Sequence, residues 1–206
     1  MASHNLPSES DTNATHASLF GRLRAKAGPE REVAWDEFQA RYAPLIAGFA
    51  ARCGASRQDI DDIIQDVMTG MLRAADGFEY DPSKGRFRSF LKTCTVRASI
   101  RRAGKNMRFR GMPLDELPQA EIAVEPVWND VWEQQVVARA LSVLRNEQSA
   151  SLAFLAFEQY VLFDRPAETV AAELGTSVNN VHQAKTRMTK LLKETVQRLR
   201  EQEDNG

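Results

Sequence analysis

The chain has 206 residues, 43% hydrophobic and 27% charged, with a net charge of −1, a composition typical of a water-soluble protein large enough to bury one or two cores. No apolar run approaches the roughly 18 to 20 residues of a membrane span, and the polar start carries no secretory signal, so we expect a cytoplasmic protein without membrane insertion. Two cysteines and three histidines, dispersed along the chain, exclude a disulfide scaffold and provide no metal-ligand constellation, so we expect neither a metal nor a cofactor.

The charges are grouped in blocks. Residues 59–81 carry seven acids and one base, whereas residues 84–110 carry ten bases and no acid. Residues 115–133 hold six acids and no base, and residues 185–200 return to six bases and one acid. Because a phosphate backbone meets one face of a protein and not its net charge, these blocks favour a nucleic-acid partner.

The N-terminal residues 1–30 are rich in Ser, Asn, Thr and Ala with little hydrophobic periodicity, and we expect a disordered tail. A first helix is expected to begin near Glu32, because apolar residues follow at helical spacing up to Phe49. Gly54 suits the left-handed residue that ends a helix.

The second expected helix has the clearest pattern. Ser56 and Asp59 form a capping box, and a continuous apolar stripe follows as far as Leu72. A turn-rich loop over residues 77–85 then separates it from a third helix that begins at Phe87. These helices would make a first domain, residues 31–110.

Three prolines interrupt residues 111–128, and acids keep this segment solvated, so we expect an extended, flexible linker. Asn129 is expected to cap the next helix, and a further helix is expected over about residues 149–162. They belong to a second domain, residues 129–203.

The end of the second domain is predicted to be a helix-turn-helix. A short helix after Pro166 leads to a turn at Gly175, and Ser177 caps a long last helix. No segment has strand alternation, so the predicted fold class is all-α, with two small helical domains joined by the acidic linker.

Polar side chains at the start of the last helix suit contacts with base edges and phosphates in a major groove. The candidates for duplex DNA are Asn179, Asn180, His182, Gln183, Lys185, Thr186 and Arg187. The alternative is a helical hairpin that only packs.

Aromatic residues lie among the ten bases of residues 84–110. Proteins that bind single-stranded nucleic acid combine such bases, which contact phosphates, with aromatic rings that stack on the nucleobases. A solvated helix face is the alternative, although such faces usually alternate in sign.

The second helix carries Asp62, Gln65 and Asp66 on its polar side. Paired carboxylates can serve acid–base catalysis, but no second polar group or substrate site accompanies them in the sequence. We interpret them as a docking face for a basic partner, with plain solvation as the alternative. Without a nucleophile–base pair, metal set or phosphate loop, we expect no enzyme and no small-molecule substrate.

Three runs resemble bacterial RNA polymerase sigma factors of the sigma-70 family: FQARY at 38–42, DDIIQDV at 61–67 and GRFRSFL at 85–91. With a linker and a C-terminal helix-turn-helix, the chain resembles more narrowly the extracytoplasmic-function class (group IV). That class keeps only two helical domains, sigma regions 2 and 4. The resemblance implies a protein that binds core RNA polymerase, directs it to promoters and assists melting without catalysis.

The resemblance also implies roles for individual residues. Asp62, Gln65 and Asp66 would contact the clamp helices of the largest polymerase subunit. The residues implied for the minus-ten element are Phe78, Tyr80, Lys84, Arg86, Arg88, Lys92, Arg97, Arg101 and Arg102. The last helix would read the minus-thirty-five element, and the linker acids Asp115, Glu116, Glu121 and Glu125 would mimic phosphates in the polymerase cleft.

The implied partners are core RNA polymerase and promoter DNA, in the cytoplasm and on the nucleoid when polymerase is bound, and an anti-sigma protein stays open as a further partner. The alternative function is a stand-alone helix-turn-helix regulator whose N-terminal domain senses a ligand or a protein. The polar face at Asp62, Gln65 and Asp66 distinguishes the sigma factor from the stand-alone regulator, because only a protein that binds polymerase requires it.

Overall fold

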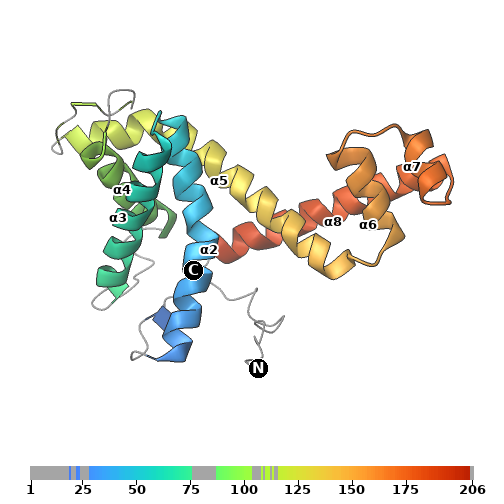
Figure 1. The fold of residues 1–206 in the computed structure, drawn as a ribbon, viewed down its shortest axis with the longest axis horizontal. Coiled ribbons are helices and arrows are strands. Elements are labelled where there is room, and N and C mark those ends of the chain that lie inside the picture. The colour runs from blue at the N-terminus through green and yellow to red at the C-terminus, as the bar shows by residue number, and fades with distance from the viewer. Residues whose placement is uncertain are drawn as a thin grey trace. The chain divides into compact units, whose positions relative to one another are not determined.

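The computed structural model describes Leu19 and residues 22–23, 28–75, 87–103, 108, 110–111, 113 and 116–204 (Figure 1). These residues form helices and their connections, with no strand among them, so the predicted all-α class is confirmed. Within the described ranges, no helix is long and apolar enough to cross a membrane. The chain divides into two compact units, Met1–Trp132 with Gln202–Gly206, and Glu133–Glu201.

Unit 1 begins with buried residues that precede its first long helix, α2 (Pro29–Arg52). Leu19 and Leu23 are buried, and the Arg22 side chain forms an ion pair with Glu37 of α2. The expectation of a disordered tail over residues 1–30 is therefore wrong at these positions. Burial of two leucines stabilises this segment, which a composition-based argument overlooks.

Helix α2 starts earlier than expected, with Pro29 in its first turn, where a missing N–H costs no helical hydrogen bond. Gly54 follows its end with a φ of 88°, the left-handed conformation expected there. In α3 (Arg57–Ala75) the capping box is confirmed. The Asp59 N–H donates to the Ser56 hydroxyl, and the Ser56 N–H donates to the Asp59 carboxylate, each at 3.2 Å.

Helix α4 (Phe87–Arg101) begins at the expected residue and packs against α2 and α3. The buried Phe87 ring lies 5.1 Å from the ring of Tyr42 and 6.1 Å from that of Phe38, centroid to centroid. This aromatic cluster holds α4 on α2. The loop expected at residues 77–85 lies outside the described residues.

The prediction of an extended linker over residues 111–128 is wrong from Leu117 onward, because these residues form the start of helix α5 (Leu117–Gln148). Ala120, Val124 and Trp128 lie four residues apart and are buried in unit 1, so one apolar stripe fixes the helix in spite of Pro126 inside it. Proline removes one helical hydrogen bond, and burial of the stripe outweighs that loss. Asn129 lies inside α5 and caps no helix.

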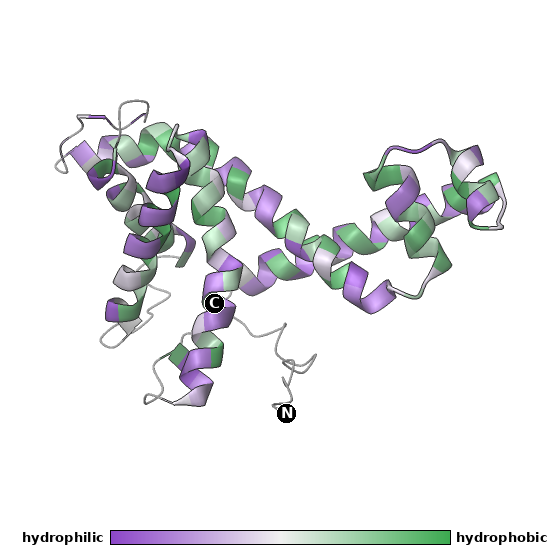
Figure 2. Cartoon of the chain, in the orientation of Figure 1, coloured by the Kyte–Doolittle hydropathy of each residue, from purple (hydrophilic) through white to green (hydrophobic). Residues whose placement is uncertain are grey.

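Unit 2 contains α6 (Leu152–Phe157), which continues as the π-helix η4 (Glu158–Leu162), then α7 (Ala167–Glu173) and most of α8 (Val178–Asp204). The helix expected over 149–162 therefore starts at Leu152 and ends in a wider turn. Hydrophobic residues recur between hydrophilic ones along α8 (Figure 2). Two buried clusters form the core of the unit: Ala156, Ala167, Val170, Ala171, Val181 and Ala184, and Leu144, Phe154, Phe157 and Met188.

The connection from α7 to α8 has the expected local structure. Gly175 has a φ of 61°, which a glycine adopts without strain. The Asn180 N–H donates to the Ser177 hydroxyl at 3.1 Å, so the predicted serine cap of α8 is confirmed.

Candidate functional site

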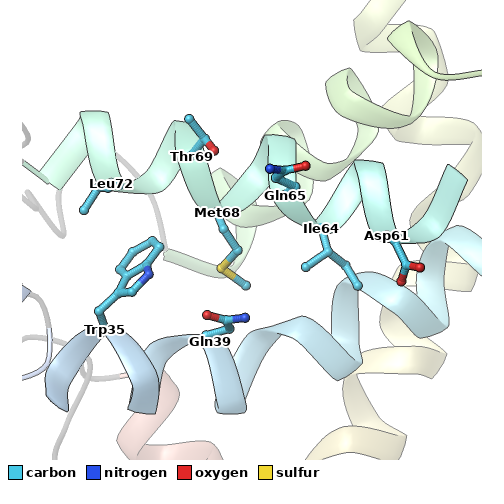
Figure 3. Close-up of a pocket in the computed structure, with 8 residues that line it drawn as sticks. All are labelled: Trp35, Gln39, Asp61, Ile64, Gln65, Met68, Thr69 and Leu72. Atoms are coloured by element: carbon cyan, nitrogen blue, oxygen red, sulfur yellow. The ribbon is translucent and has the colours of Figure 1, made fainter. Parts of the chain in front are cut away.

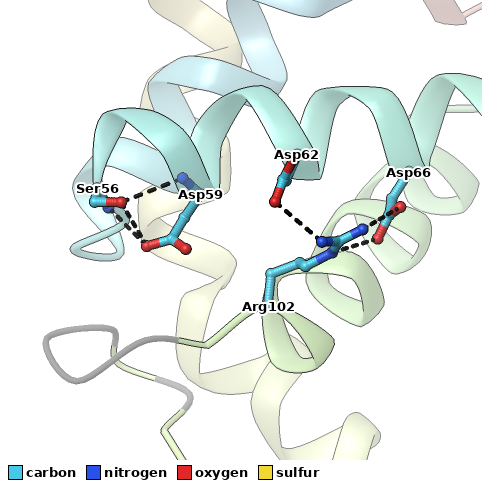
Figure 4. A network of polar contacts seen from close by, with 5 residues as sticks. All are labelled: Ser56, Asp59, Asp62, Asp66 and Arg102. Atoms are coloured by element: carbon cyan, nitrogen blue, oxygen red, sulfur yellow. Dashed lines mark hydrogen bonds and ion pairs between the residues drawn. The ribbon is translucent and has the colours of Figure 1, made fainter.

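The two aspartates of the predicted acidic face lie on the side of α3 that meets the end of α4 (Figure 4). Arg102, directly after α4, donates from one guanidinium nitrogen to Asp62 at 3.0 Å. It donates from the other two nitrogens to both carboxylate oxygens of Asp66, also at 3.0 Å. The side chains of Arg102, Asp62 and Asp66 are 42%, 41% and 28% exposed, so this triad stands at the surface.

The electrostatic consequence is clearest at Asp66. Its pKa is held below the usual range, chiefly by the hydrogen bonds from Arg102 and further by the charges of Arg102 and Arg101, against a smaller opposing effect of burial. The same contacts raise the pKa of Arg102. Both shifts favour the charged forms, so Asp66 stays negative and Arg102 stays positive at neutral pH.

Gln65 lies apart from the triad, in a groove between α2 and α3 with a volume of about 460 Å³ (Figure 3). The groove is lined by Trp35, Gln39, Asp61, Ile64, Gln65, Met68, Thr69 and Leu72. The predicted trio thus divides between two sides of α3. The sequence analysis missed Asp61, Trp35 and Gln39, although Asp61 and Gln65 have the spacing of neighbours on one helix face.

The basic residues predicted for the minus-ten element also separate. Phe78, Tyr80, Lys84 and Arg86 lie outside the described residues. Arg88 and Lys92 of α4 face α5: Arg88 donates to the Asn129 side-chain oxygen at 2.5 Å and lies 4.9 Å above the Trp132 ring. Lys92 forms an ion pair with Glu125.

Arg97 and Arg101 lie on another side of α4. Arg97 follows Arg88 by nine residues, about two and a half helical turns, which places it on the opposite side of the helix. Both Arg97 and Arg101 are exposed. Of the linker acids expected to mimic phosphates, Glu125 is already engaged by Lys92, and Asp115 lies outside the described residues.

All seven candidates at the start of α8 are exposed. The Asn180 side-chain amide donates to the Thr176 hydroxyl at 3.0 Å, and the Thr186 hydroxyl donates to the His182 carbonyl oxygen at 3.1 Å. Asn179, Gln183 and Arg187 follow one another at intervals of four residues, which places them along one side of the helix.

Tyr160 of η4 contacts this surface and was not anticipated from the sequence. Its ring meets the His182 ring edge-on at 5.3 Å, and the Lys185 ammonium lies 5.3 Å from the ring centroid. A half-buried tyrosine in an irregular turn has no periodic signal, so sequence reasoning had no means of pairing it with α8.

No three His, Cys, Asp or Glu side chains within the described ranges are grouped as metal ligands. The candidate binding surfaces are therefore the triad of Arg102, Asp62 and Asp66 and the α2–α3 groove on two sides of α3, the exposed arginines of α4, and the polar start of α8 in unit 2.

Residues 38–109 match the family model for Sigma-70 region 2. The matched segment lies in unit 1 and includes α3, α4 and all the groove residues except Trp35, and it supports a sigma-70 family sigma factor, the resemblance seen in the sequence. Comparisons with curated proteins and with solved structures gave no match.

Proposed function

We propose that this protein is a sigma factor of the extracytoplasmic-function class that binds core RNA polymerase, directs it to particular promoters and assists DNA melting by binding energy alone. The observation that carries the proposal is the Sigma-70 region 2 match over residues 38–109, which includes the charged and grooved surface of α3. Its partners are core polymerase and promoter DNA, with an anti-sigma protein as a further candidate partner.

Helix α3 would dock on a basic helical surface of the polymerase. The aspartates supply charge complementarity, which steers association and fixes the orientation of the partners. The groove beside Gln65 adds apolar area from Trp35 and Leu72, and burying apolar surface supplies affinity that ion pairs at an exposed site lack.

The opened DNA strand would be met by α4 and the residues before it. Because Arg88 and Lys92 bind α5, the described residues best suited to phosphate contact are the exposed Arg97 and Arg101. This modifies the expectation from the sequence, which assigned Arg88 and Lys92 to the melted strand as well. Arg88 and Lys92 would instead hold α5 against α4.

The duplex upstream element would be read by the start of α8. Asn and Gln side chains can bond an adenine edge and Arg can bond a guanine edge, and Asn179, Gln183 and Arg187 present these groups along one side of the helix. Lys185 and His182, supported by Tyr160, would lie beside them.

The docking assignment is tested by charge reversal in the groove, away from the Arg102 triad. Asp61→Lys with Gln65→Lys should place like charges against a basic partner and cost several kcal/mol of core binding. Glu32→Lys with Gln58→Lys is the control, since it changes the net charge equally at exposed positions outside the groove.

Core binding is measured by fluorescence anisotropy, and run-off transcription reports the consequence for initiation. Equal binding by the groove variant, the control and the unmodified protein would reject the docking surface. Duplex binding by a chain that never binds core would favour the stand-alone regulator.

A further inference from the structure

Arg102 joins two surfaces to which the proposed function gives different partners. The resemblance places it among the residues that contact the melted strand, whereas its guanidinium is bonded to Asp62 and Asp66, the two acids assigned to polymerase. One guanidinium cannot hold both carboxylates and a phosphate in the same geometry, because the fork that binds Asp66 at two oxygens is the fork that binds phosphate.

The contact is well formed but open to exchange. Three hydrogen bonds of 3.0 Å use all three nitrogens of the guanidinium, and the three side chains are between 28% and 42% exposed. Ion pairs at such exposure contribute little to folding. A contact of good geometry and small contribution to stability can be replaced by another cation without loss of the fold.

The charges around the triad favour exchange. The next cation is Arg101, one residue before Arg102, and its charge also reaches Asp66. Asp59 adds a negative charge on the same helix. With Arg102 in place one negative charge of the pair is cancelled, and with Arg102 withdrawn the full charge of two aspartates is presented to a partner.

We propose that Arg102 is an internal stand-in for the basic side chain of the docking partner: it occupies Asp62 and Asp66 in the free protein, the partner's cation displaces it, and the released guanidinium then becomes available to nucleic acid. The inference rests on the proposed function for the identity of the two partners. Docking and strand binding are then coupled, and by linkage each strengthens the other by the same factor.

The first experiment measures binding to core polymerase without DNA. Arg102→Gln removes the competing cation, so its affinity for core should rise by about 5-fold or more, at the lower end of typical coupling between sites. Arg101→Gln is the matched control. It deletes the same charge at the neighbouring position, and the Arg101 side chain forms no ion pair with Asp62 or Asp66 in the described structure. Its affinity should change by less than about 2-fold.

The second experiment uses the isolated protein and a single-stranded oligonucleotide. Asp62→Asn with Asp66→Asn frees Arg102, so strand binding should rise, and adding Arg102→Gln should remove most of that gain. Asp61→Asn with Asp36→Asn changes the net charge equally without freeing Arg102, so Arg102→Gln should have little effect in that background. This double-mutant comparison separates release of one residue from general attraction.

Each outcome has a definite meaning. Unchanged or weaker core binding by Arg102→Gln would overturn the proposal and make Arg102 a residue that positions the acids for docking. If no form of the protein binds core, the proposed function fails, and the oligonucleotide experiment still decides whether Asp62 and Asp66 sequester Arg102. Equal effects of Arg102→Gln in both aspartate backgrounds would overturn that sequestration.

Discussion

Trp128 of α5 lies edge-on against Phe49 of α2, with the ring centroids 5.3 Å apart. The two residues are far apart in sequence, and their contact places the first half of α5 in the core of unit 1. The segment expected to be a solvated connection is therefore part of a folded unit.

Replacing Trp128 by Ala should destabilise the protein by about 3–5 kcal/mol, because the side chain is 1% exposed and its loss leaves a cavity against Phe49. Urea unfolding followed by circular dichroism measures the change. Ile122→Ala is the control on the same helix, 75% exposed and expected to change stability by less than about 0.5 kcal/mol. If both substitutions changed the free energy of unfolding by the same small amount, Trp128 would not be buried and the prediction of an extended linker would stand.

Substitutions of two helical glycines, Gly70 and Gly48, should change the stability of the protein in opposite directions. A Cβ at Gly70 would have no neighbour within 4 Å, so Gly70→Ala should stabilise α3 by roughly 0.5–1 kcal/mol. A Cβ at Gly48 would lie 3.1 Å from a methyl group of Val131, so Gly48→Leu should force α2 and α5 apart and cost about 1–3 kcal/mol. Thermal unfolding of both variants tests the close approach, and a neutral Gly48→Leu would contradict it.

The pKa of Asp66 should rise toward its usual value in Arg102→Gln, because the hydrogen bonds from Arg102 are the main cause of the lowered pKa. A lowered pKa in the folded state stabilises the protein above the unfolded value of about 3.9, and this contribution disappears as the pH falls through the folded pKa. The stability difference between Arg102→Gln and the unmodified protein should therefore be present at neutral pH and shrink below about pH 4. Carboxyl NMR titration gives the pKa directly. If the pKa of Asp66 were the same in Arg102→Gln and in the unmodified protein, the ion pair would be absent in solution.

The two thiols should differ in reactivity. Burial raises the pKa of the Cys53 thiol to about 11, against a smaller opposing effect of Arg108, so roughly one molecule in a thousand would carry the thiolate at pH 8. The pKa of Cys94 is also raised by burial, but this residue is partly exposed. Iodoacetamide at pH 8 should label Cys94 first and Cys53 only on unfolding, as followed by peptide mass spectrometry. Early labelling of Cys53 would contradict its burial.

Arg187→Ala should weaken binding of a promoter duplex by about 1–3 kcal/mol if this exposed side chain bonds a base, and should relax selectivity at that position. Lys193→Ala, also exposed on α8 but almost two turns further along, is the control for loss of charge. Binding to a panel of singly substituted duplexes separates the two effects. Equal weakening of every duplex by both variants would assign Arg187 to phosphate contact.

Local features of this protein were predictable from its sequence. The Ser56–Asp59 capping box, the left-handed Gly54 and the Ser177 cap depend on residues within a few positions of one another, so short-range hydrogen bonds and backbone sterics determine them. The acidic run of α3 was likewise visible as a pattern, as was its likeness to sigma-70 region 2.

Only the tertiary structure decided what those residues contact. The sequence grouped Asp62, Gln65 and Asp66 as one face. In the folded protein the packing of α4 brings Arg102, 40 and 36 residues away, into hydrogen bonds with the two aspartates, whereas Gln65 lies in the groove beside α2. Pro126 and the neighbouring acids predicted an open chain, but burial of Trp128 against Phe49 outweighs a lost helical hydrogen bond. Local propensity fixes which segments can be helices, whereas the free energy of burial and the pairing of distant charges depend on partners that meet only when the chain is folded.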